Sequence, residues 1–174
     1  TKSSRGTILV DKSGLWKGKP YKPLTSVNNS SKGRNNLGRI TSRNHGGGHK
    51  HKYRNIDFYR KKIDIVGTVE RIEYDPNRSC HIMLVVFEDK ERFYYLAPQK
   101  IKVGDKIQNG PNSDIKNGNC LPLKDIPVGI NIHNVEIQPG AGGKIARAAG
   151  SSVSISGIDG NYSIVKMSSG EVRK

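Results

Sequence analysis

The residues best suited to chemistry lie between positions 33 and 54, where the chain reads GRNNLGRITSRNHGGGHKHKYR. Arg and Lys side chains donate charge-assisted hydrogen bonds to phosphate, and glycine lets a backbone approach a partner closely. No apolar residue recurs at the spacing that would bury one face of a strand or a helix. Two interpretations are open: a loop that RNA orders, or a disordered basic tail. The mixture of Asn, Gly, His and aromatic residues favours RNA.

Three histidines in this stretch, His45, His49 and His51, raise the question of a metal site. A zinc ion would need a fourth ligand and a rigid frame. The nearest cysteine is the distant Cys80, and three consecutive glycines separate the first two histidines. Contact of the imidazoles and the neighbouring lysines with RNA is therefore favoured. We expect no metal site and no cofactor, apart from Mg²⁺ ions that RNA itself would bind.

A second glycine-rich stretch, GAGGK at 140–144, imitates a nucleotide phosphate loop. That motif needs Gly at 138 and Ser or Thr at 145, whereas the chain has Gln138 and Ile145. Two interpretations remain: backbone amides that hold an RNA phosphate together with Lys144 and Arg147, or a plain flexible turn. The chain also lacks Gly-x-Ser-x-Gly, and its carboxylates are scattered through turns. We therefore predict that it is not an enzyme.

The positive charge is concentrated in the first third of the chain. Residues 1–63 contain 16 of the 30 Lys and Arg and only 2 of the 15 acids, so the remainder is nearly neutral. The first part is too polar to fold alone, and the rest is apolar enough to bury a core. This asymmetry indicates a nucleic acid or an anionic membrane as partner. Because no apolar run approaches the roughly 20 residues that span a membrane, nucleic acid is favoured and no membrane partner is expected.

The elements that position these residues are predicted to be short strands. They follow an extended arm in which Trp16 either packs on the body or stacks on a base. Apolar runs bounded by turn residues predict four strands, at 65–74, 82–87, 93–96 and 103–107. The second of these runs is apolar on both faces and should be the central strand. Four strands at this spacing predict a small closed barrel.

A second group of short strands follows a polar, glycine-rich linker. Its strands are predicted at 130–137, 152–156 and 162–167, with Asp159-Gly160 as a hairpin signal. The one helix candidate is 144–149. The sequence therefore predicts an all-β fold with two small barrels in series.

The ordered motifs resemble the universal large-subunit ribosomal protein family "L-two" (L2), in its bacterial and organellar form. The resemblance covers nearly the whole chain, with motifs at 33–41, 46–50, 53–58, 69–79, 96–98, 118–123, 126–129, 139–150 and 169–173. It implies an extended basic N-terminal arm at 1–34 and an oligonucleotide-binding-fold RNA-binding domain at 35–115. It also implies a Src-homology-3-like barrel at 120–174, which is truncated.

The same resemblance implies a structural constituent of the large ribosomal subunit. Such a protein binds and stabilises large-subunit rRNA, contacts neighbouring ribosomal proteins, and supports subunit association and the peptidyl-transferase region without performing the chemistry. The alternative from another class is a free-standing RNA chaperone or regulatory RNA-binding protein.

Family members continue beyond the point where this sequence stops. Since unpaired sheet edges are a liability, we expect a second chain to carry the missing C-terminal segment, as a split mitochondrial gene would provide. A mitochondrial ribosome is therefore the first expectation, and the bacterial cytoplasm is the alternative.

The positions expected to contact RNA combine cations, short amides, imidazoles and one tyrosine that could stack on an unpaired base. They are Arg34, Asn35, Asn36, Arg39, Arg43, His45, His49, Lys50, His51, Lys52, Tyr53, Arg54, Arg60, Lys61, Lys62, Arg78, Lys144 and Arg147.

Overall fold

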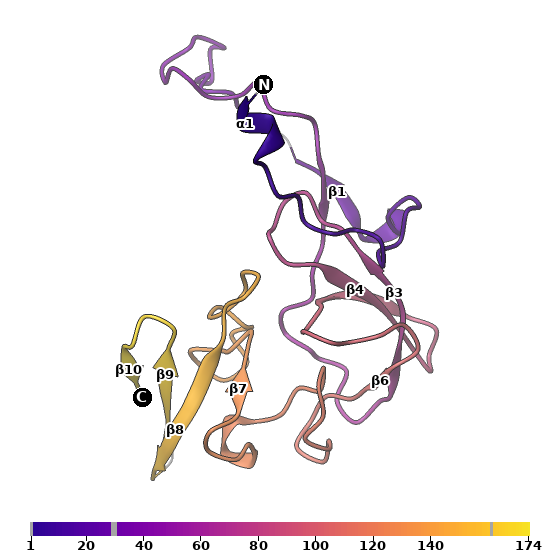
Figure 1. Cartoon of the computed structure of the whole chain (residues 1–174), viewed down its shortest axis with the longest axis vertical. Helices are drawn as coiled ribbons and strands as arrows, with labels where there is room; N and C mark the ends of the chain where they lie inside the picture. Colours follow the sequence, from indigo (N-terminus) through magenta and orange to yellow (C-terminus); the bar gives the residue numbers. More distant parts are fainter. Residues whose placement is uncertain (1, 29–30, 161) are drawn as a thin grey trace.

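The computed structural model describes residues 2–28, 31–160 and 162–174, and it confirms the all-β class. The described strands form two four-stranded antiparallel sheets and one two-stranded ribbon (Figure 1). Helix in these ranges is limited to three single turns, α1 (Lys2–Arg5), η1 (Lys22–Leu24) and η2 (Leu123–Asp125). The helix expected at 144–149 is wrong, because Ile145 instead forms a bridge with Val135.

The first sheet has the strand order β5-β4-β3-β6 and curls like half of a barrel. Its strands are β3 (Gly67–Glu73), β4 (Ile82–Phe87), β5 (Arg92–Leu96) and β6 (Lys106–Ile107). The prediction of a central strand is confirmed, since β4 lies between β3 and β5. Its side chains pack with Val69 and Tyr95 on one face and with Tyr94 and Leu96 on the other. This two-faced burial explains the continuous apolar run.

The second sheet has the order β10-β9-β8-β7 and a smaller core. Its strands are β7 (Asn131–Ile132), β8 (Val153–Asp159), β9 (Tyr162–Met167) and β10 (Val172–Arg173). The predicted hairpin is confirmed, because Asp159 pairs with Tyr162 across it. The strand expected at 130–137 is shorter, because Asn134 takes a left-handed conformation with φ of 53° and so ends the extended run.

Both sheets are open rather than closed barrels in the part of the chain described, and other segments cover the edges of the first one. Strand β6 pairs only with Gly67 and Thr68 of β3, and beyond them the Trp16 N–H donates to the Ile72 carbonyl at 2.8 Å. On β5, the Asp57 N–H donates to the Tyr94 carbonyl at 3.0 Å. The Trp16 ring lies 4.9 Å from the Arg71 guanidinium and stays half exposed. Trp16 therefore packs on the body, as one of the two interpretations expected.

A buried polar network fastens the N-terminal arm to the first sheet. The Tyr94 hydroxyl donates to the Glu73 carboxylate, with oxygens at 2.9 and 3.0 Å, and accepts the Tyr21 N–H at 2.8 Å. Arg71 Nε donates to the same carboxylate at 2.7 Å. Burial raises the pKa of Tyr94 to about 12. The arm thus depends on a phenol that must stay protonated.

We expect the free energy of unfolding to fall as the pH rises from about 10 to about 12. The folded state holds the Tyr94 proton more tightly than the unfolded chain, so this stabilisation is complete below the unfolded pKa and is lost as the pH rises through the folded value of about 12. Urea unfolding of Tyr94→Phe over this range should show a smaller decrease. Tyr162→Phe, which changes an exposed ring, is the control. The same decrease in all three proteins would contradict the assignment.

Candidate nucleic-acid interface

The cationic loop is carried by a two-stranded ribbon, β1 (Thr25–Val27) and β2 (Lys52–Arg54). The 75–78 turn holds β2 in place. Asn77 donates to the Lys52 carbonyl at 2.9 Å, and the fully buried Asp75 carboxylate lies 3.9 Å from the Arg54 guanidinium. The loop therefore leaves the first sheet from a fixed base and lies at the far end of the molecule from the second sheet (Figure 1).

The start of the loop folds back on itself through local hydrogen bonds. The Asn35 side-chain oxygen accepts the N–H groups of Leu37 at 3.0 Å and Arg39 at 2.9 Å. The Ser42 N–H donates to the Gly33 carbonyl at 3.1 Å. Gly33 has φ of 73°, and a Cβ there would meet the Ser42 carbonyl oxygen at 2.1 Å. Asn35 therefore stabilises the turn at the start of the loop, and its side-chain oxygen already accepts two hydrogen bonds.

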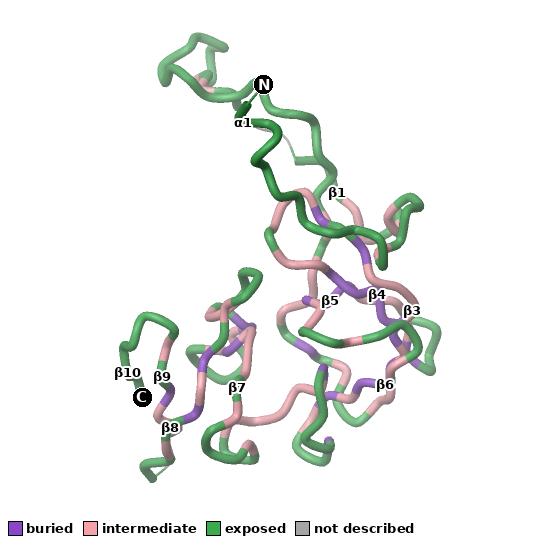
Figure 2. The backbone as a smooth tube through the Cα atoms, in the orientation of Figure 1, coloured by how far each residue is buried: buried purple, intermediate pink, exposed green. Residues whose placement is uncertain are grey.

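The rest of the loop has no core, as expected. Residues 36–53 are exposed throughout (Figure 2). In the described structure no carboxylate forms an ion pair with the cations at the loop, which are Arg34, Arg39, Arg43, Lys50 and Lys52. Tyr53 keeps about a third of its surface exposed, and the Arg78 guanidinium lies 5.8 Å from its ring centroid. This segment therefore presents positive charge that no carboxylate of the described structure neutralises, on an exposed backbone.

Several other predicted positions already have partners inside the protein. The Arg60 guanidinium is buried, lies 3.7 Å from the Tyr95 ring centroid and donates to Asn109 Oδ1 at 3.2 Å. Burial lowers the pKa of Arg60. Lys62 pairs with two carboxylates of the 88–91 turn, and Arg78 pairs with buried Asp75. Arg60 is therefore inaccessible to a partner, and two further cations are neutralised by neighbours.

The second glycine-rich stretch is occupied by the protein itself. The Glu136 carboxylate accepts the N–H groups of Gly140 at 2.8 Å and Gly142 at 2.9 Å. These amides were expected to hold a phosphate or to form a flexible turn, but an internal anion fills them. Arg147 donates to the Gly143 carbonyl, and its guanidinium lies 4.0 Å from the Phe58 ring centroid. Through these contacts the stretch packs against Phe58, which itself lies against the core of the first sheet. Lys144 at the end of the stretch stays exposed.

The three histidines do not form a metal cluster. The rings of His49 and His51 lie 5.4 Å apart between centroids, without His45. No group of three or more His, Cys, Asp or Glu side chains gathers as metal ligands in residues 2–28, 31–160 and 162–174. The same ranges contain no helix with the length and apolar character to cross a membrane. All three imidazoles lie on the exposed part of the loop.

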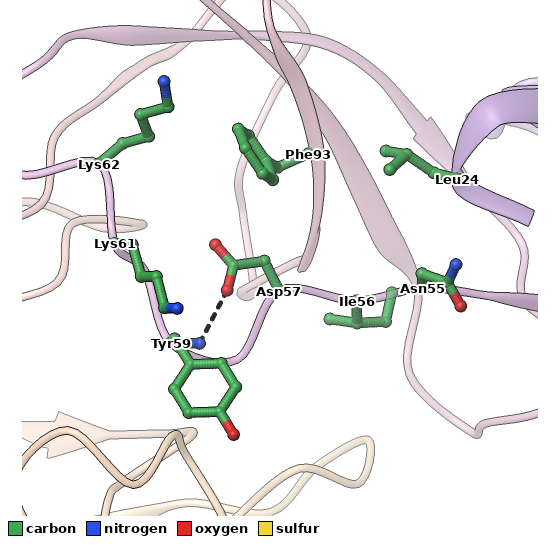
Figure 3. A pocket seen from close by; sticks show the side chains of 8 residues that line it. All are labelled: Leu24, Asn55, Ile56, Asp57, Tyr59, Lys61, Lys62 and Phe93. Carbon is green, nitrogen blue, oxygen red and sulfur yellow. Dashed lines mark hydrogen bonds between the residues drawn. The ribbon is translucent and has the colours of Figure 1, made fainter.

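Sequence reasoning missed a shallow depression beside β5, which we call the β5 depression (Figure 3). It has a volume of about 450 Å³. Its surface combines aliphatic and aromatic side chains with charges, chiefly Leu24, Ile56, Asp57, Tyr59, Lys61 and Phe93. Asp57 Oδ1 accepts the Tyr59 N–H at 2.9 Å, which fixes the bend between these residues. The available signal was the aromatic pair Phe58 and Tyr59, placed between Asp57 and the cations at 60–62.

Two family models match the chain and together cover most of it. "Ribosomal Proteins L2, RNA binding N-terminal domain" matches residues 21–109, and "Ribosomal Proteins L2, C-terminal domain" matches residues 116–174.

Similar proteins named "Large ribosomal subunit protein uL2" come from bacteria. The one from Pelagibacter ubique is 74% identical over 175 residues, which is 100% of this chain and 62% of the relative. Those from Granulibacter bethesdensis and Rickettsia canadensis are 57% and 56% identical, over 99% of this chain and 63% of each relative. The chain thus spans under two thirds of the length of these curated relatives. They give no support to the expectation of a mitochondrial ribosome and fit the bacterial alternative.

Proposed function

Because the chain belongs to the ribosomal protein L2 family, we propose that it is a non-enzymatic structural constituent of the large ribosomal subunit that binds rRNA. The loop at 33–54 provides the main contact, and the two sheets act as rigid mounts. Neighbouring ribosomal proteins are further proposed partners. The bacterial relatives favour a ribosome in the bacterial cytoplasm.

The observation that carries this proposal is the contrast between two groups of cations. Arg34, Arg39, Arg43, Lys50 and Lys52 of the loop have no ion pairs within the described structure. In contrast, Lys62, Arg71, Arg78 and Arg92, on or beside the first sheet, each bind a carboxylate. Phosphate oxygens would supply the partners that the loop lacks, through charge-assisted hydrogen bonds. The exposed Lys61 and Lys144 would extend the contact towards the second sheet.

The domain boundaries remain part of the proposal: an arm at 1–34, an RNA-binding domain at 35–115 and a second domain at 120–174. The family models, with limits at 109 and 116, are compatible with a division near the linker. A second chain that adds to the second sheet stays a prediction with no support from the relatives.

The affinity for large-subunit rRNA should fall steeply with salt. If about six loop cations each neutralise a phosphate, the association constant should drop by roughly a thousandfold between about 50 and about 200 mM monovalent salt. Filter binding of the whole chain to bacterial large-subunit rRNA measures this slope. A nearly flat salt dependence would remove the electrostatic mechanism.

The alternative, a free-standing RNA chaperone or regulator, would use the same loop on other RNAs. Sedimentation distinguishes the two functions. A ribosomal constituent should be recovered with large subunits in near-stoichiometric amount after a moderate salt wash, while a chaperone should remain mostly in the light fractions.

A further inference from the structure

The β5 depression offers uncovered apolar surface at the edge of the first sheet. Leu24 and Ile56 pack on their inner side against the core that contains Tyr94, and Phe93 packs against the core on the opposite face of the sheet. Tyr59 leaves 55% of its surface exposed. These side chains line one hollow, and the Tyr59 ring lies at its margin and points away from Phe93 (Figure 3). The volume of about 450 Å³ lies within the usual range for small-ligand sites.

One carboxylate and two lysines line this hollow, and Asp57 Oδ1 already accepts the N–H groups of Tyr59 and Arg60. Lys61 has no ion pair in the described part of the chain, and its Nζ lies 5.3 Å from the Tyr59 ring centroid. The adjacent Lys62 is neutralised by Asp89 and Glu91. One free cation therefore stands next to an exposed aromatic ring. An apolar ligand alone would not use this cation, whereas a planar group attached to an anion would use both features.

The hollow also continues the proposed RNA interface. Strand β2 ends at Arg54, and Asn55 and Ile56 directly after it form one wall of the β5 depression. An RNA strand that follows the exposed loop along β2 would reach this wall within a few residues. Charge complementarity and continuity thus both point to RNA rather than to an apolar protein segment.

We infer that the β5 depression binds one unpaired nucleotide of RNA, with its base against the exposed ring of Tyr59 and its phosphate at Lys61. This inference rests on the proposed function and makes it more specific, because it adds a base-stacking contact to a surface otherwise defined by charge. Tyr59 is a binding residue that the cationic pattern of the sequence does not reveal.

The test uses the whole chain and an unstructured single-stranded hexaribonucleotide with a central 2-aminopurine, a base whose fluorescence changes on stacking. Tyr59→Leu should raise the Kd by about 5- to 150-fold, the usual effect of losing one stacked base. Tyr59→Phe, which keeps the ring, should stay within about twofold. Tyr162→Leu, which removes an exposed tyrosine from the second sheet, is the matched control. Lys61→Gln should lower the slope of log Kd against log salt by about 0.7.

The outcomes separate this inference from the proposed function. If the wild-type chain fails to bind large-subunit rRNA, the proposed function is wrong. If it binds rRNA but Tyr59→Leu behaves like Tyr162→Leu with the fluorescent oligonucleotide, the proposed function stands and the nucleotide site is excluded. Loss of the 2-aminopurine signal in Tyr59→Leu, with the signal kept in Tyr59→Phe, would support the site. Thermal unfolding of each variant verifies that the fold is unchanged.

Discussion

Replacement of Arg34, Arg39, Arg43 and Lys50 by Gln should lower the affinity for large-subunit rRNA by about 10³- to 10⁴-fold at about 0.1 M salt. Each phosphate contact releases a counterion, which at this salt contributes roughly eightfold to the association constant. The four side chains have no ion pairs in the described structure, so their removal leaves no carboxylate uncompensated. The free energy of unfolding should therefore change by less than about 0.5 kcal/mol.

The control is a second fourfold variant, which loses the same net charge at positions in the body of the protein. Four exposed lysines outside the loop serve for this purpose, namely Lys100, Lys102, Lys106 and Lys124. Their replacement by Gln should reduce rRNA binding far less, because these lysines lie outside the loop that is proposed to contact RNA. Filter binding at several salt concentrations measures both sets. Equal losses would mean that net charge, rather than the loop, determines binding.

Local patterns were sufficient where one short segment decides its own structure. The run Ile82–Phe87 predicted a central strand because both faces of β4 are buried, and every second residue of an edge strand would have been polar. Asp159-Gly160 predicted its hairpin because glycine accepts the positive φ, here 58°, that the turn requires. The exposed loop was also predictable, since its residues offer nothing to bury.

The sequence could not distinguish the three neighbouring cations Arg60, Lys61 and Lys62. Arg60 turns inward onto Tyr95, Lys61 stays exposed, and Lys62 pairs with carboxylates of the 88–91 turn. The outcomes for Arg60 and Lys62 depend on residues about 30 positions further along the chain, which only the packed sheet brings near. Glu136 differs from them, because it fills the amides of the second glycine-rich stretch from only four and six positions away. Residue type identifies a phosphate-binding group, but tertiary contacts decide whether it is available.

Arg60→Ala should destabilise the protein by about 3–5 kcal/mol, although the sequence groups this residue with RNA-binding cations. The substitution removes a desolvated contact of the guanidinium with the Tyr95 ring, at 3.7 Å. It also leaves the buried Asn109 Oδ1 and the Gly118 carbonyl without the donors they have at 3.2 and 3.5 Å. Each unpaired acceptor costs roughly 1–3 kcal/mol. Urea unfolding should show a lower midpoint with an unchanged m-value.

The neighbouring Lys61→Ala provides the matched control, because this exposed side chain should change the free energy of unfolding by less than about 0.5 kcal/mol. For rRNA binding we expect the opposite order, with the larger effect from Lys61→Ala. At a temperature where both are folded, Arg60→Ala should keep the rRNA affinity within about twofold, and Lys61→Ala should weaken it by roughly eightfold at about 0.1 M salt. An Arg60→Ala protein with unchanged stability and weakened binding would place this guanidinium at the RNA surface instead of in the core. The contact with Tyr95 therefore makes Arg60 the sharpest test of whether burial overrides residue type in this chain.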